Sequence, residues 1–174
     1  MSNIALPDYA RNGQIFTACN QAAATVTLIN TSTATGFILS NPWGSGKKLL
    51  LTNATFNYTT VPTATAIVFL AMSIAPSPVA HASTTALTIY GADGSGARGD
   101  SVARAYSAST TPNLPVYTRQ IGYAPTTPAT TGGLTWSPSF EGEISLVPGA
   151  YLQISYITTA PVGITSMTWV EVRA

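Results

Sequence analysis

Charged side chains are scarce in this sequence. Lysine and arginine together number seven, aspartate and glutamate six, so charged residues make up 7% of the 174 residues and the formal net charge is +1. An average soluble domain carries about 25% charged residues. Because phosphate binding needs a cluster of basic side chains and the sequence has none, we expect no nucleic-acid partner.

Cysteine and histidine are represented by one residue each. A single cysteine excludes an intramolecular disulfide framework, and Cys19 with His81 cannot supply the four ligands of a usual structural zinc site. No motif indicates that the two form a nucleophile and its base. We therefore expect no catalytic residue, no metal site and no cofactor. Cys19 is interpreted as a buried or incidental thiol and His81 as a loop or surface residue.

Long apolar runs are also missing. The longest, Ala64–Ala75, is shorter than the roughly 20 residues that a membrane-spanning helix needs. The segment Met1–Arg11 contains Asp8 and lacks the apolar core of a signal peptide. We expect a protein made in the cytoplasm, with no membrane partner.

Threonine, serine and alanine are abundant instead, with 27, 16 and 25 residues respectively. Proteins that stay monomeric usually rely on surface charge for solubility. A neutral surface of this kind therefore favours a protein that covers much of its surface in an assembly. The alternative is a neutral, threonine-rich β-protein without such an assembly.

Short runs rich in Val, Ile, Thr, Tyr and Phe alternate with Gly, Pro, Asn and Ser, which predicts an all-β protein. The number of runs fits an antiparallel two-sheet sandwich. We place it over residues 25–174, behind an extended N-terminal arm over residues 1–24. The expected strands are Thr25–Asn30, Gly36–Ser40, Lys48–Tyr58, Thr65–Ile74, Ala86–Tyr90, Val116–Tyr123, Glu143–Val147, Ala150–Thr158 and Ile164–Val172.

Two local patterns carry further predictions. The Pro148-Gly149 turn joins two runs of period-2 alternation, which predicts a hairpin with Leu146 and Leu152 both facing the core. The segment Asp100–Ser107 is compatible with a short helix capped by its first residue.

The run Thr65–Ile74 is apolar on both faces, unlike the other strands. In a sandwich only one face of a strand meets the core, so the second face needs another cover. We predict that Ile67 and Phe69 on this second face contact a neighbouring subunit. Cover by the chain's own loops is the alternative.

The stretch Phe140–Tyr156 alternates apolar and polar residues, turns at Pro148-Gly149 and continues as a second alternating run. This pattern resembles the penultimate hairpin of trimeric jelly rolls of the complement C1q and tumour-necrosis-factor type. The resemblance implies that the sandwich is a jelly roll.

Several features together resemble the small accessory virion proteins of tailed bacteriophages, which decorate or cement the capsid. These features are a short N-terminal arm, a Thr/Ala/Ser-rich body, the segment Ser40–Leu49 leading into the longest strand, and the turn Leu146–Tyr151 with a closing Thr168–Glu171. The resemblance implies a structural role, a homotrimer, the major capsid protein as partner and a location on the capsid surface of the virion. On this hypothesis the arm contacts the capsid through Ile4, Leu6, Tyr9, Ile15 and Phe16.

Two other functions remain open. A receptor- or glycan-binding module, such as a phage fibre tip, would gather Trp43, Trp136 and Tyr117 at one end as a platform for stacking sugars. A β-sandwich glycanase would need two carboxylates, such as those of Glu143 and Glu171, facing each other across a cleft.

Overall fold

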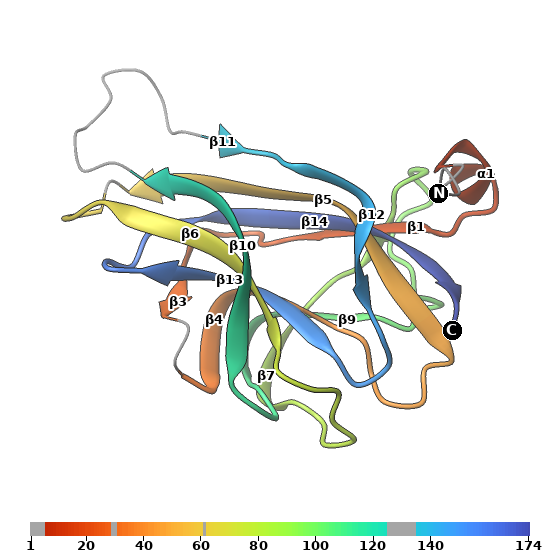
Figure 1. Cartoon of the computed structure of the whole chain (residues 1–174). Helices are drawn as coiled ribbons and strands as arrows, with labels where there is room; N and C mark the ends of the chain where they lie inside the picture. Colours follow the sequence, from red (N-terminus) through yellow and green to blue (C-terminus); the bar gives the residue numbers. More distant parts are fainter. Residues whose placement is uncertain (1–5, 29–30, 61, 125–134) are drawn as a thin grey trace.

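The protein consists of two β-sheets packed face to face (Figure 1). The computed structural model describes residues 6–28, 31–60, 62–124 and 135–174. The first sheet has the order β11-β5-β14-β1-β8, with β12 also paired to β5 and β2 to β14. Its strands are β1 (Ile15–Cys19), β2 (Ala24–Thr25), β5 (Lys47–Thr60), β8 (Tyr90–Gly91), β11 (Thr135–Trp136), β12 (Ser139–Leu146) and β14 (Val162–Arg173).

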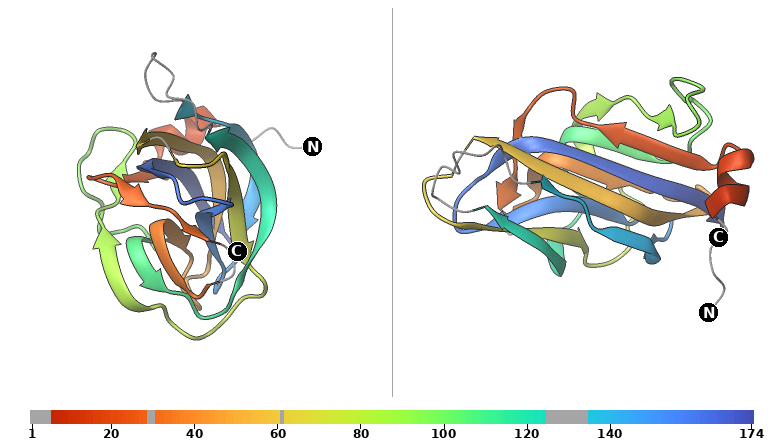
Figure 2. Two further views of the ribbon diagram at one scale, coloured as in Figure 1. Left: turned by 90° about the vertical axis from the view of Figure 1, so that its left-hand side faces the viewer. Right: turned by 90° about the horizontal axis from the view of Figure 1, so that it is seen from above.

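The second sheet has the order β10-β6-β13-β4-β9-β7, with the short β3 running parallel to β13. Seen end-on and from above, the two sheets form two layers (Figure 2). One short helix, α1 (Leu6–Arg11), precedes β1. The strands of the second sheet are β3 (Thr27–Leu28), β4 (Thr33–Ser40), β6 (Ala66–Ser73), β7 (Ala82–Leu87), β9 (Arg104–Thr110), β10 (Pro115–Ala124) and β13 (Tyr151–Ile157).

Eight strands form the framework and confirm the predicted jelly-roll sandwich. In the first sheet they lie in the order β12-β5-β14-β1, and in the second in the order β10-β6-β13-β4. All these neighbours are antiparallel. The last two strands, β13 and β14, thus insert between early strands, as two interleaved Greek keys require.

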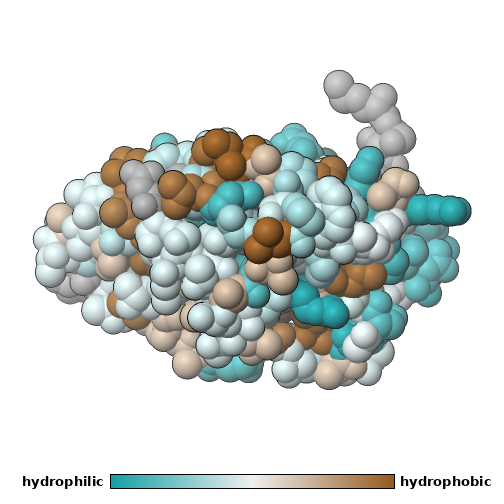
Figure 3. Space-filling model, turned by 90° about the horizontal axis from the view of Figure 1, so that it is seen from below, coloured by the Kyte–Doolittle hydropathy of each residue, from teal (hydrophilic) through white to brown (hydrophobic). Residues whose placement is uncertain are grey.

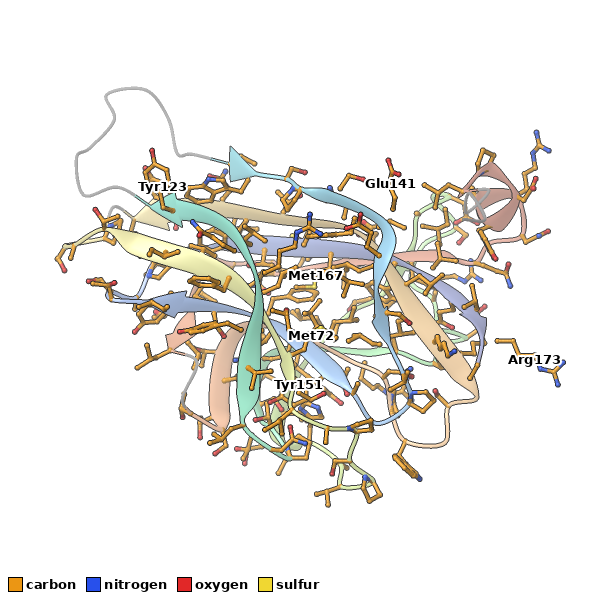
Figure 4. All side chains as sticks on the ribbon, in the orientation of Figure 1. Met72, Tyr123, Glu141, Tyr151, Met167 and Arg173 are labelled. Carbon is orange, nitrogen blue, oxygen red and sulfur yellow. The ribbon has the colours of Figure 1, made fainter. Side chains whose placement is uncertain are left out.

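The apolar faces of both sheets meet between the layers. Met167 projects from β14 into this space and is fully buried (Figure 4). The prediction that Leu146 and Leu152 face the core is confirmed. The largest side chains of the core are Trp169, Phe37, Phe56, Phe140, Leu39, Leu49, Leu51, Leu70, Leu146 and Leu152.

The predicted hairpin around Pro148-Gly149 is wrong. The turn itself forms, with the Ala150 N–H donating to the Val147 carbonyl at 3.0 Å. However, β12 pairs with β5 in the first sheet, whereas β13 pairs with β4 and β6 in the second. The turn therefore carries the chain from one sheet to the other. Each strand still presents its apolar face to the same core. For this reason, the alternation alone was enough to predict that both leucines face the core.

The short helix compatible with Asp100–Ser107 does not form. Residues 104–110 are strand β9, which pairs with β4 on one side and β7 on the other. Pairing on both sides outweighs the helical preference of the alanines. The Asp100 carboxylate accepts hydrogen bonds from the Arg98 guanidinium at 2.6 and 2.7 Å and is not a helix cap.

The extended arm predicted over residues 1–24 is wrong, because residues 6–11 form helix α1 and part of the second half belongs to the sandwich. Residues 15–19 form β1, which lies between β14 and β8. Phe16 is only 2% exposed and stacks on Trp169 with ring centroids 6.2 Å apart. The period-2 burial of Phe16 and Ala18 places this strand firmly in the sandwich.

A buried carboxylate joins the loop before β9 to the first sheet. The side chain of Glu171 on β14 is fully buried and pairs with the Lys47 ammonium group at 2.9 Å. It also accepts hydrogen bonds from the Ser101 hydroxyl at 2.6 Å and from the Val102 N–H at 3.0 Å. Since a buried charge is tolerated only when it is paired and hydrogen-bonded, these contacts fix the loop's position.

We predict that Glu171→Gln lowers the free energy of unfolding by about 2–4 kcal/mol, because the amide loses the ion pair and offers one acceptor oxygen where two were used. Urea denaturation measures the effect. Glu143→Gln is the matched control, since Glu143 is exposed and pairs with Arg119 at 2.8 Å. That exposed pair is expected to contribute about 0–1 kcal/mol. Equal effects of the two changes would contradict the structural role of Glu171.

Candidate functional site

The outer face of the second sheet carries an uncharged, largely apolar surface. In register, Ile67 on β6 lies beside Tyr123 on β10 and Ile157 on β13. Two residues further along β6, Phe69 packs against Tyr117 of β10, with ring centroids 4.5 Å apart. We call Ile67, Phe69, Tyr117, Tyr123 and Ile157 the outer patch.

The outer patch is only partly covered by its own chain. The Tyr117 hydroxyl donates to the Tyr156 carbonyl at 3.2 Å, which holds its ring over Phe69. Partial burial raises the pKa of the Tyr117 phenol. Ile67 and Phe69 are half-buried, while Tyr123 is 55% exposed. The second face of β6 is thus sheltered by neighbouring strands but not closed.

A pocket of about 190 Å³ lies at the other end of the second sheet, where the β4–β5 and β6–β7 loops meet. Trp43 stands at its rim and is 59% exposed. We call it the Trp43 pocket. It is lined by Ser40, Asn41, Pro42, Trp43, Ser77, Pro78, Val79, Ala80, His81, Tyr106, Pro112 and Gly149.

His81 is a packed wall of this pocket and not a free surface residue. Its ring lies between those of Tyr106 and Tyr151, with centroids 5.4 and 5.2 Å away. Its Nδ1 shares a 2.7 Å hydrogen bond with the Ser109 hydroxyl. Burial lowers the pKa of His81 from 6.5 to about 4, so the imidazole is neutral at pH 7.

Asn41 is a buried position of the Trp43 pocket that the sequence reasoning missed. It is fully buried, and its Nδ2 donates to the carbonyls of Lys47 and Leu146 at 2.8 and 2.9 Å. Its Oδ1 accepts from the Ser45 hydroxyl at 2.7 Å. These contacts shape the loop that presents Trp43. The Asn-Pro-Trp-Gly sequence signals a turn, but no local pattern indicates that the amide bonds to a strand 105 residues away.

Trp136 closes an edge of the sandwich. Its ring stacks on Phe56 and lies against Tyr58, both with centroids 5.9 Å away. On its other side it packs so closely on Gly122 that a side chain there would clash. Phe56 and Tyr58 belong to the first sheet and Gly122 to the second, so the indole bridges the two layers.

The three aromatic residues considered for sugar stacking do not lie together. Trp43 stands at the pocket rim, near the start of β5, whereas Trp136 pairs with Phe56 nine positions further along that strand. Tyr117 lies on the outer patch. Of the three, only Trp43 combines high exposure with a neighbouring pocket.

The expected arm contacts are also separated. Leu6 and Tyr9 are half-buried residues of α1, and Ile15 is a half-buried residue of β1. Phe16 belongs to the core and is not available to a partner. Ile4 lies outside the described residues.

The acidic residues form no catalytic pair in the described part of the chain. Glu143 on β12 and Glu171 on β14 are separated by β5, and the first is exposed while the second is buried. Asp93 and Asp100 both pair with Arg98, at 3.8 and 2.6 Å. The Arg98 guanidinium lowers the pKa of Asp100 to about 2 through its hydrogen bonds.

Within the four described segments, no group of three His, Cys, Asp or Glu side chains lies close enough to hold a metal ion. Cys19 is half-buried, and burial raises the pKa of its thiol. Among the residues that the structure places, no helix is long and apolar enough to cross a membrane.

Comparison with protein-family models, with curated proteins and with solved structures found no match.

We predict that Trp136→Ala destabilises the protein by about 3–5 kcal/mol, because it opens a cavity between the sheets. Trp43→Ala is the matched control, and its cost is expected to stay below about 1 kcal/mol because the indole is mostly exposed. Chemical denaturation of both variants measures the difference. If Trp43→Ala costs as much as Trp136→Ala, the assignment of one ring to the fold and the other to the surface is wrong.

His81 predicts a pH dependence of stability. Its folded-state pKa is depressed, so the unfolded chain takes up a proton first as the pH falls. The free energy of unfolding should therefore decline from about pH 6.5 toward pH 4 and be level above that window. His81→Gln should remove this slope, as followed by urea denaturation at several pH values. Asp100 titrates lower, near pH 2, and does not account for the same window. An identical slope in the variant would contradict the prediction.

Proposed function

We propose that the protein is a structural, non-catalytic virion component. In this proposal it binds the outside of an assembled bacteriophage capsid as a homotrimer and decorates or cements the shell. It is made in the host cytoplasm and its partner is the major capsid protein. The proposal combines the resemblance of the sequence to phage accessory proteins with two properties of the surface.

The outer patch is the observation that carries the proposal. Its residues Tyr123, Ile67 and Ile157 present an apolar row across three adjacent strands, and Phe69 lies two residues further along β6. No charged side chain interrupts the rows between β6 and β13 that the structure describes. An uncharged, partly apolar sheet face of this kind favours contact with another protein surface. Two further copies of the same chain are the simplest partners for the outer patch, because closed symmetry covers the same patch in every subunit.

The scarcity of surface charge supports the same role. Much of the face seen from below has intermediate hydropathy, with apolar groups set among it (Figure 3). Several of the few charged side chains are already paired, among them Arg98 with two aspartates and Arg119 with Glu143. Such a surface suits a protein that is soluble enough to diffuse before assembly and then stays bound to other protein molecules.

A trimer gains its capsid affinity from several weak contacts made at once. Binding only to the assembled lattice stabilises the shell by mass action. With β1 inside the sandwich, the capsid contact is reduced to the segment before it, including Ile4, Leu6 and Tyr9. Deleting residues 1–12 should therefore weaken capsid binding and leave the fold intact.

The experiment measures the mass of the full chain by size exclusion with light scattering. Three chains of 18.0 kDa give about 54 kDa. Ile67→Lys should convert this species to a monomer. Ile164→Lys is the control, because Ile164 is an exposed isoleucine on the first sheet and its substitution should leave the trimer intact. A monomeric wild-type chain would refute the trimer.

The capsid role is tested on purified virions whose genome encodes this chain. The protein should be found on their capsids, and virions lacking it should lose their DNA at lower temperature. Its absence from the virions would refute the proposed function.

A further inference from the structure

The Trp43 pocket has the shape and polarity of a ligand site that the capsid role does not use. We propose that it binds one neutral sugar ring, the terminal residue of a glycan. The proposal goes beyond the structural function and does not depend on it, since the pocket lies at one end of the second sheet and the outer patch toward the other. Tyr151, beside the pocket, and Tyr123, in the outer patch, mark these two ends (Figure 4).

The described lining of the Trp43 pocket carries no acidic side chain, lysine or arginine. His81, the one titratable base in this described lining, is neutral at pH 7 because its pKa is lowered by burial. A charged ligand would lose its hydration here and find no opposite charge, whereas a neutral ligand meets no such penalty. The lining therefore selects against anions and cations.

Trp43 gives the pocket a flat apolar wall. The indole of Trp43 rests on Gly149, where even an added Cβ would lie 2.6 Å from Cε3 of the ring. This contact fixes one part of the indole and leaves the rest open. Pro42 and Pro78 add further rigid apolar surface. An aromatic face of this kind suits the C–H side of a pyranose ring, which is flat and apolar.

The pocket lining also includes polar side chains. His81 uses Nδ1 for Ser109, and its Nε2 has no hydrogen bond to any residue that the structure describes. Tyr106 and Ser40, which both carry a hydroxyl group, belong to the same lining. Donors and acceptors around the rim of an apolar pocket are what orient a hydroxylated ring.

The pocket is also held in its shape before any ligand binds. The Gly149 N–H donates to the Asn41 carbonyl at 2.7 Å, and the Ser77 N–H donates to the Gly149 carbonyl at 2.9 Å. Three separate loops are thus tied together around the opening. Little ordering entropy is left to be lost on binding, which favours a weakly held ligand such as a single sugar.

A proline-rich peptide is the other neutral ligand that binds to aromatic and proline surfaces. The size of the pocket favours a sugar over such a peptide. A peptide of that kind docks along a groove through successive residues. The Trp43 pocket is a single hollow of about 190 Å³, smaller than the roughly 300 Å³ at which pockets for drug-sized ligands begin. This volume suits one sugar ring better than several successive residues of a peptide.

The test titrates the full, ¹⁵N-labelled chain with the methyl glycosides of glucose, galactose, mannose and N-acetylglucosamine, each followed by NMR. The three tryptophans give three indole N–H signals. With at least one glycoside, the Trp43 signal should shift saturably together with the backbone signals of Val79 and Gly149. The Trp136 and Trp169 signals should not move.

Trp43→Ala should abolish the shifts of the Val79 and Gly149 backbone signals, and His81→Ala should weaken sugar binding severalfold. Tyr90→Ala is the control, because Tyr90 is an exposed aromatic residue on β8 outside the pocket, and it should bind as the wild type does. Absence of saturable shifts with all four glycosides would overturn the proposal. Shifts that persist in Trp43→Ala, or saturable binding of a polyproline peptide in place of the sugars, would overturn it as well. None of these results bears on the mass of the protein or its presence on virions.

Discussion

The Asn41 side chain is the contact on which both layers of this sandwich depend. It lies where β4 ends, β5 begins, β12 ends and β13 begins, and it hydrogen-bonds the backbone of two of these strands. Its own backbone bonds to Gly149 and Ala150 across the turn between the sheets. A buried amide with its donors and acceptor engaged holds two β-sheets in one relative position, which a purely apolar contact does not specify. The geometry of the Trp43 pocket follows from this anchor, because the loops that form it leave from the same point.

Several of the few charged side chains help to close the fold. Glu171 pins the loop before β9, Arg98 spans two aspartates and lies over Phe16 at 5.2 Å, and Arg119 lies over Phe140 at 5.1 Å while pairing with Glu143. Each of these groups covers an edge where the apolar core would otherwise meet water. Much of the rest of the surface consists of threonine, serine and alanine, which carry no charge.

Period-2 alternation was sufficient to predict most of the strands and the inward facing of Leu146 and Leu152. It was insufficient where pairing is long-range. The Pro148-Gly149 turn has the same local chemistry whether it closes a hairpin or carries the chain to the opposite sheet, so only the global topology decides. Strand β1 was missed because its alternation spans five residues, and β9 because alanines favour helix when no partner strand is considered. For the site, exposure of Trp43 was foreseeable from its Pro-Trp-Gly context, whereas the packing of His81 between two tyrosines arises from strands far apart in sequence.

The central position of β14 determines when the first sheet can form. This strand lies between β5 and β1, and it supplies Met167, Trp169 and Glu171 to the interior. A ribosome has released nearly all of the preceding chain before these residues emerge. Until then β1 and β5 have no shared neighbour, and the inner face of the first sheet stays open. The first sheet can therefore close only after β14 has been synthesised.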